Sequence, residues 1–293
     1  MTSGKPQITQ AMIDAYDEYT HLTLDRRGFM QKLTGLAGSA AAAAAIAPML
    51  AASKAKAAIV PEDDPAIVSA ETTWPAAGAE MTGTIVRPAS ESGPMPGVIV
   101  IHENRGLNDH VRDVARRMAK DGFVALAPDF LSEAGVTPGD EDKAREMIGA
   151  LDAARTVELA TATEAWLRGA EGVNGRVGAV GFCWGGGLVN SLAVADPDLG
   201  AGVAYYGRQA PADDVPKIRA PLLLHYAGLD ERINAGIPAY EEALKAANKD
   251  YRIFVYEGVN HAFNNDTSAA RYDKAASDLA WGRTVSFLRE KLA

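Results

Sequence analysis

The sequence predicts an α/β fold in which helices cover both faces of a mostly parallel central sheet. Short apolar runs rich in Val, Ile and Leu alternate along the chain with longer segments of helical periodicity. Such alternation implies βαβ crossovers and a sheet buried on both faces. In addition, polar residues capable of catalysis follow several of the apolar runs, at the carboxyl ends of the expected strands, where such sheets bind ligands.

Six apolar runs bounded by Gly, Pro or Asp are expected to be buried strands, at residues 97–102, 123–127, 176–182, 202–206, 221–226 and 252–256. Two earlier runs, at 66–74 and 80–86, are expected to pair as antiparallel strands. Helical patterns occupy residues 107–120, 140–168, 186–194, 236–248 and 269–292.

Composition limits the possible functions. The chain has 293 residues and a formal net charge of −9, which argues against nucleic-acid binding, because phosphate recognition needs clustered Lys and Arg. The single cysteine, Cys183, excludes an intrachain disulfide and a cluster of cysteine ligands.

The N-terminal part has the three regions of a twin-arginine export signal. Arg26 and Arg27 precede an Ala/Gly-rich, mildly apolar stretch at 33–52, and Ala55-Lys56-Ala57 resembles a cleavage site. A stable membrane span is disfavoured because this stretch is weakly hydrophobic and contains Pro48.

We therefore expect residues 1–57 to be an export signal and leader and residues 58–293 to form one α/β domain. The protein is expected to use the twin-arginine translocation machinery and to be periplasmic or secreted. If the leader is not used, the protein is cytoplasmic. The sequence assigns no role to residues 1–24, and it does not indicate the oligomeric state.

The sequence Gly181-Phe182-Cys183-Trp184-Gly185 lies between an expected strand and an expected helix. This is the pattern of a G-x-S-x-G nucleophile elbow with cysteine in place of serine. The glycines allow a sharp turn close to neighbouring strands, and the following helix directs its N-terminal amides toward the thiol. The positive end of that helix favours the thiolate, so Cys183 is the candidate nucleophile.

Two further candidates follow later strands, Asp230 after 221–226 and His261 after 252–256. Nucleophile, acid and base occur in the chain order expected of an α/β-hydrolase. His261 is the candidate base, and Asp230 is expected to orient it and stabilise the imidazolium. Each of these residue types is also common in ordinary loops, so their combination carries the prediction.

His102, Glu103 and Asn104 end the run at 97–102, where α/β-hydrolases place part of the oxyanion hole. The expected oxyanion donors are the backbone amides of Asn104 and Trp184. Three other histidines were assigned no catalytic role. His21 lies in the leader, His110 is expected on a helix surface, and His225 is expected in the core.

No metal site is predicted, because the histidines and carboxylates lack ligand spacing along the chain, and no cofactor-binding motif is present.

The segments at 101–105, 181–187 and 258–263, together with Asp230, resemble the dienelactone hydrolase family of α/β-hydrolases over residues 66–292. The resemblance implies hydrolysis of a small lactone or carboxylic ester by a Cys–His–Asp triad through a thioester, without a cofactor. It also implies that Glu103 lies beside the cysteine at rest. Arg145 matches one substrate-binding arginine of the family, whereas Asn265 stands where a second arginine is expected.

An acidic group of the substrate would therefore be bound weakly, because Asn265 offers only neutral hydrogen bonds. An alternative function is a non-catalytic or redox-sensing thiol protein on a hydrolase scaffold. A complete triad argues against a non-catalytic protein, and the absence of a resolving cysteine argues against a redox-sensing thiol protein.

Overall fold

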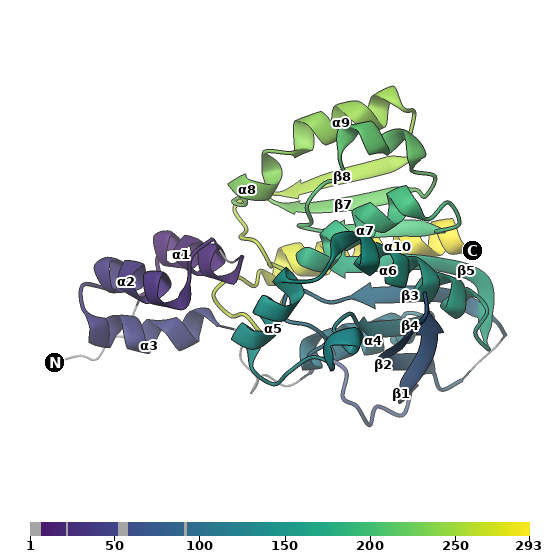
Figure 1. Ribbon diagram of the computed structural model, residues 1–293, viewed down its shortest axis with the longest axis horizontal. Coiled ribbons are helices and arrows are strands. Elements are labelled where there is room, and N and C mark those ends of the chain that lie inside the picture. The colour runs from purple at the N-terminus through teal and green to yellow at the C-terminus, as the bar shows by residue number, and fades with distance from the viewer. Residues whose placement is uncertain (1–6, 22, 52–57, 91–92) are drawn as a thin grey trace.

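The computed structural model describes residues 7–21, 23–51, 58–90 and 93–293. A twisted sheet forms its centre, and three N-terminal helices stand to one side of it (Figure 1). The expected strands and helices recur with small shifts in their bounds.

Eight strands form one sheet in the order β1-β2-β4-β3-β5-β6-β7-β8. The pairs β1·β2 and β2·β4 are antiparallel, and the strands from β4 to β8 are parallel, as the sequence predicts. The strands are β1 (Ile67–Ala76), β2 (Ala79–Pro88), β3 (Met95–Ile101), β4 (Val124–Asp129), β5 (Val173–Phe182), β6 (Ala201–Tyr205), β7 (Leu222–Ala227) and β8 (Tyr251–Tyr256).

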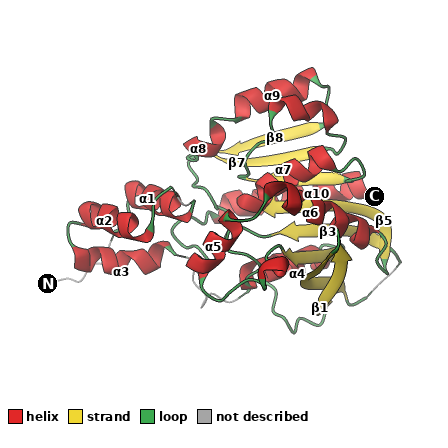
Figure 2. Cartoon of the chain, viewed as in Figure 1, coloured by secondary structure: helices red, strands yellow, loops and turns green. Residues whose placement is uncertain are grey.

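Helices cover both faces of this sheet and enclose two apolar cores, as the coloured cartoon shows (Figure 2). One face is covered by α4 (Asp109–Lys120) and α10 (Lys274–Leu292). The other is covered by α6 (Ala153–Arg168), α7 (Trp184–Ala195) and α9 (Ile237–Ala246). Smaller elements are α5 (Glu141–Gly149), α8 (Glu231–Asn234) and the 3-10 turns η1 (Ser132–Ala134) and η2 (Ala212–Lys217).

Two expected helices have different bounds, and in both cases an aspartate cap explains the difference. The helical pattern at 140–168 is divided into α5 and α6, because the Asp152 side chain accepts a hydrogen bond from the backbone amide of Arg155 and starts a new helix. The last helix begins at Lys274 rather than near residue 269. Asp273 caps it by accepting from the amide of Ala276.

The N-terminal helices are α1 (Gln10–Thr20), α2 (Arg26–Ala37) and α3 (Ala40–Leu50). Their apolar side chains form a separate small core that includes Tyr16, Phe29 and Leu33. Asp25 caps α2 by accepting from the amide of Gly28, so the two arginines of the expected export signal begin a helix. The expected cleavage site at 55–57 lies outside the described residues.

No single helix among the described residues is both long and apolar enough to cross a membrane. Together α2 and α3 meet the length and composition of a span, but the two are bent by 113° relative to each other.

Candidate active site

Cys183 lies at the sharp turn between β5 and α7. Its φ of +54° is a strained value for a residue with a side chain, as expected at a nucleophile elbow. A Cβ atom at Gly181 would lie 2.1 Å from the carbonyl oxygen of Gly185, and one at Gly185 would lie 2.5 Å from that of His102. The two glycines are therefore required by close backbone approach, and they allow the turn to present the thiol above the sheet.

Asp230 and His261 meet beyond the ends of β7 and β8. The Nδ1 atom of His261 lies 2.5 Å from Oδ2 of Asp230, and both side chains are buried. Asp230 also accepts from the amide of Ile233 at the start of α8, which fixes the carboxylate. The hydrogen bond to Nδ1 leaves Nε2 of His261 as the free ring nitrogen, and this atom has no hydrogen-bond partner among the described residues.

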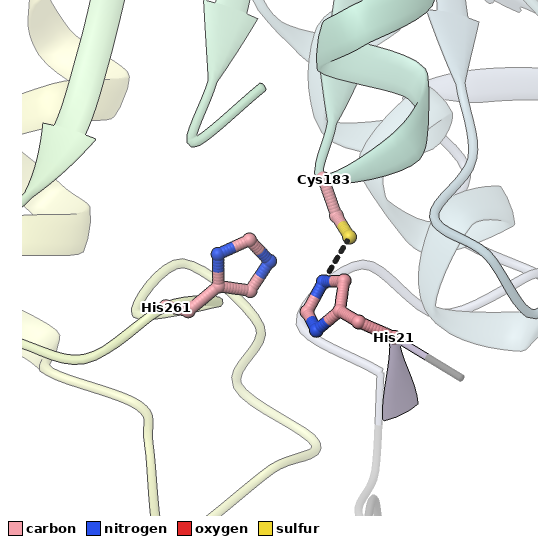
Figure 3. A group of neighbouring side chains, drawn as sticks. All are labelled: His21, Cys183 and His261. Atoms are coloured by element: carbon pink, nitrogen blue, oxygen red, sulfur yellow. Dashed lines mark hydrogen bonds between the residues drawn. The ribbon is translucent and has the colours of Figure 1, made fainter. Parts of the chain in front are cut away.

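His21, from the end of α1, lies in the same site. Its Nε2 atom is 3.4 Å from Sγ of Cys183, and its ring meets that of His261 edge to face with centroids 4.8 Å apart. Figure 3 shows one ring nitrogen of each imidazole facing the sulfur. Sequence patterns do not indicate His21 as a site residue, because it lies 162 residues before the cysteine.

Opposing effects act on the thiol. Burial raises the pKa of Cys183, but the positive charges of His261 and His21 and the hydrogen bond with His21 lower that pKa to about 6. Conversely, burial opposes the charged form of His261, but the thiolate, Asp17 and Asp230 raise its pKa well above the ordinary value. The site therefore favours a thiolate paired with imidazolium at neutral pH.

The cavity above the thiol is nearly filled. Its volume is about 10 Å³, and Cys183, His261, Glu103 and the α1 residues Thr20 and His21 are among its lining residues. That is about the space that one water molecule needs, on the order of 10–15 Å³. An ester or lactone cannot enter while α1 is in this position.

Several contacts hold α1 over the site. Asn104 Nδ2 donates to the carbonyl of Thr20 at 2.5 Å, and Arg105 donates to the Tyr16 hydroxyl at 2.6 Å. Asp17 lies 3.8 Å from the guanidinium of Arg271. The N-terminal segment, defined here as described residues 7–51, therefore contacts the same loop that carries the predicted oxyanion amide.

Arg145 was predicted to bind substrate, and in this closed arrangement it contacts the N-terminal segment; its role in substrate binding stays a prediction. Its guanidinium lies over the ring of Tyr19 with 4.1 Å to the centroid, and it pairs with Asp142 on its own helix. The reason is that α5 packs against α1, so this arginine contacts the N-terminal segment instead of the space above the thiol.

Glu103 lies on the cavity wall, but its hydrogen-bond partner is Asn265 and not the cysteine. Asn265 Nδ2 donates to Oε2 of Glu103 at 2.8 Å, while Oε1 has no hydrogen-bond partner among the described residues. Burial raises the pKa of Glu103, yet the charges of His110, Arg105 and Arg271 hold it below its usual value. The backbone amide and the hydroxyl of Thr267 both donate to Oδ1 of Asn265, so the Asn265 side chain holds Glu103 in this arrangement. The predicted role of Asn265 in substrate binding stays a prediction.

The predicted oxyanion donors come from two different parts of the chain. Trp184 is the first residue of α7 and follows Cys183 directly, so its backbone amide belongs to the helix N-terminus. Asn104 follows β3 and lines the cavity. The assignment of both amides to the oxyanion remains a prediction.

One of the remaining histidines differs from expectation. His110 is buried and pairs with Asp266 at 3.1 Å, whereas the sequence suggested an exposed helix position. His225 is a core residue whose two ring nitrogens contact Thr284 and Tyr256, as the sequence predicts.

Comparison with known proteins identifies the family. The model of the dienelactone hydrolase family matches residues 81–292. The chain belongs to the dienelactone hydrolase family. A protein of Yersinia pestis, provisionally named a carboxymethylenebutenolidase, is 34% identical over 236 residues, covering 75% of this chain and 87% of the relative. A protein of Escherichia coli K12 with the same provisional name is 32% identical over 255 residues, covering 82% and 93%.

The crystal structure of a protein from Klebsiella pneumoniae, provisionally described as a dienelactone hydrolase, has a TM-score of 0.70 and 30% identity. It covers 75% of this chain and 98% of that one. These likenesses confirm the predicted α/β-hydrolase fold and show that this member of the dienelactone hydrolase family is a hydrolase acting on lactone or ester bonds.

Proposed function

We propose that this dienelactone hydrolase family member cleaves a small lactone or carboxylic ester through a thioester on Cys183. The observation that carries the proposal is the buried 2.5 Å contact between Asp230 and His261, beside a cysteine on a strained elbow. This is the arrangement of a nucleophile, a base and a group that orients the base.

In the first step Sγ of Cys183 attacks the carbonyl carbon, and the carbonyl oxygen becomes an oxyanion received by the amides of Asn104 and Trp184. The bond from carbon to the leaving oxygen then breaks, and Nε2 of His261 gives that oxygen a proton. A water molecule, deprotonated by His261, hydrolyses the thioester and restores the thiolate paired with imidazolium. Asp230 holds the imidazole in the required tautomer throughout.

The acylation step requires α1 to leave its position over the thiol, because a cavity of about 10 Å³ is too small for an ester or a lactone. The N-terminal segment therefore keeps this site closed in the full-length chain. Its displacement, or its removal together with a cleaved leader, would open the site.

We also propose that the protein is exported by the twin-arginine pathway. The paired arginines at the start of α2, followed by the apolar α3, support this proposal. If the folded enzyme is exported with its thiol covered, it stays inactive until the leader is removed.

The triad is tested by Cys183→Ala and His261→Ala in a screen of lactones and esters. We expect each variant to lose roughly 10⁴-fold or more in kcat, because triad members act as a unit. His225→Gln is a matched histidine substitution away from the thiol, and it controls for damage to the fold. Near-normal turnover by a folded His261→Ala protein would show that another group is the base.

A further inference from the structure

His21, Cys183 and His261 come from three distant parts of the chain, yet their side chains converge. One ligand-type atom of each, Sγ or a ring nitrogen, lies within 4.8 Å of the other two. All three belong to the closed arrangement in which α1 covers the elbow (Figure 3). A thiolate and two imidazoles are a ligand set that proteins use for zinc and related metals.

We propose that these three side chains form a binding site for a soft divalent transition-metal ion such as Zn²⁺, which locks the N-terminal segment onto the nucleophile. The lock would act on the proposed hydrolytic site, so its inhibitory effect rests on the proposed function. The binding of the metal ion itself does not depend on the proposed function.

The separations suit such an ion. With Zn–S near 2.3 Å and Zn–N near 2.0–2.1 Å, tetrahedral ligands stand roughly 3.5 Å from one another. The 3.4 Å distance from Sγ to Nε2 of His21 already has this value, and the ligand atom of His261, which lies within 4.8 Å of both, needs to move closer. A cavity of about 10 Å³ excludes an ester but leaves room for one ion.

The ring nitrogens are also oriented as metal ligands. Nδ1 of His261 is held by Asp230, and Nδ1 of His21 lies 2.8 Å from the carbonyl oxygen of Asp17 and 3.4 Å from its carboxylate. Carboxylate or carbonyl acceptors on Nδ1 fix Nε2 as the atom that binds a metal. Nε2 of His261 is buried at the wall of the cavity and has no hydrogen-bond partner in the described part of the chain. This nitrogen is therefore available to a metal ion.

Charge around the site is mixed. The thiolate, Asp17 and Asp230 favour a dication, whereas Arg232 lies 3.0 Å from Nε2 of His21 and opposes one. The side chain of Arg232 is 43% exposed, so it can turn into solvent when a metal binds. Arg271 stays near Asp17 and lowers the affinity without occupying a ligand position.

The experiment titrates metal-free full-length protein with Zn²⁺ against a chromophoric chelator, and separately with Co²⁺ to observe a thiolate-to-metal absorption band. We expect one equivalent to bind to the wild type. His21→Gln should weaken affinity at least tenfold. Asp17→Asn should weaken it by roughly threefold to tenfold, because it removes the carboxylate charge 3.4 Å from Nδ1 of His21 but keeps the backbone carbonyl that lies 2.8 Å from that atom.

Three further variants distinguish the loss of a metal site from damage to the fold. Cys183→Ser should abolish the cobalt band, and Arg232→Ala should increase affinity because it removes the competing charge. His110→Gln, a matched histidine substitution outside the site, should bind like the wild type. A wild type that binds no stoichiometric metal, or a His21→Gln variant that binds as tightly as the wild type, overturns the proposal.

Hydrolysis is measured in parallel on the same samples. If the metal-free protein hydrolyses esters and Zn²⁺ inhibits it reversibly, both proposals are supported. An active enzyme that binds no zinc contradicts the metal site alone. A zinc-binding protein contradicts the proposed function alone if its metal-free form shows no esterase activity even when Tyr16→Ala and Tyr19→Ala loosen α1.

Discussion

At the scale of single residues, the environment of one sulfur atom determines the chemistry. Sequence reasoning selected Cys183, Asp230 and His261 from their order and from their places after strands. The structure brings Asp230 and His261 into contact and places both histidines around the thiol. His21 could not be selected, because no local pattern connects a residue of the leader with an elbow at residue 183.

The pH dependence of the thiol tests whether His21 contributes to its ionisation. Because the positive charges of His261 and His21 lower the pKa of Cys183 to about 6, the alkylation rate should rise with pH through that value. Removing one positive neighbour disfavours the thiolate, so His21→Gln should move the midpoint upward by roughly one unit or more. Iodoacetamide labelling across a pH series measures this shift.

His225→Gln is the control for this series, because burial lowers the pKa of His225 to about 3 and this core histidine therefore carries no charge in the pH range of the titration. An unchanged midpoint in His21→Gln would mean that His261 alone sets the ionisation of the thiol.

Glu103 is a second residue with a testable role. Its buried carboxylate lies on the cavity wall and is held by Asn265. A negative charge there opposes thiolate formation, so Glu103→Gln should lower the thiol pKa and increase alkylation near neutral pH. Asn265→Leu removes the hydrogen bond while keeping the charge, and it should not increase alkylation. Equal alkylation rates in Glu103→Gln and the wild type would show that Glu103 does not affect the ionisation of the Cys183 thiol.

At the scale of elements, the sequence predicted the strands and their parallel order well, because buried strands give continuous apolar runs. It predicted the ends of helices less well. The break between α5 and α6 depends on capping by Asp152, which a periodicity argument over 140–168 does not detect. The contact of Arg145 with Tyr19 was missed for a related reason, since Tyr19 belongs to a helix to which the sequence assigned no role.

The closing element itself can be tested by loosening α1. Tyr16 and Tyr19 anchor it through Arg105, Arg145 and Asp142. We expect Tyr16→Ala combined with Tyr19→Ala to increase kcat/KM several-fold, because the thiol becomes accessible. The assays are run at a pH well above the pKa of Cys183, where the thiol is ionised in every variant. A difference in kcat/KM then reports the accessibility of the thiol and not its ionisation.

Leu36→Ala in α2 is the matched control, because Leu36 is an exposed apolar residue of the same segment. A folded double variant with reduced kcat/KM would show instead that α1 forms part of the substrate site.

At the scale of the whole molecule, an N-terminal segment with its own small core covers the candidate active site of an α/β-hydrolase fold. Composition and patterning predicted the fold, but they treated this segment only as an export leader. Contacts between segments far apart in sequence carry no periodic pattern, so the closed site could be recognised only in three dimensions.

Export is tested by changing Arg26 and Arg27 together to lysine. Twin-arginine signals require the paired guanidinium groups, so we expect the double variant to stay in the cytoplasm while the wild type is exported. Fractionation with an antibody against the catalytic domain measures the difference. Arg87→Lys, a change outside the leader, should leave export intact, and identical fractionation of all three proteins would contradict the proposed signal.

The central claim is that hydrolysis proceeds through a thioester on Cys183, and the most direct measurement is intact-mass spectrometry of enzyme quenched during turnover of an activated ester. We expect a population heavier by one acyl group, located on the peptide that contains Cys183 and absent in Cys183→Ala. Turnover that continues in Cys183→Ala, with no acyl group found on the wild-type cysteine, would contradict the account.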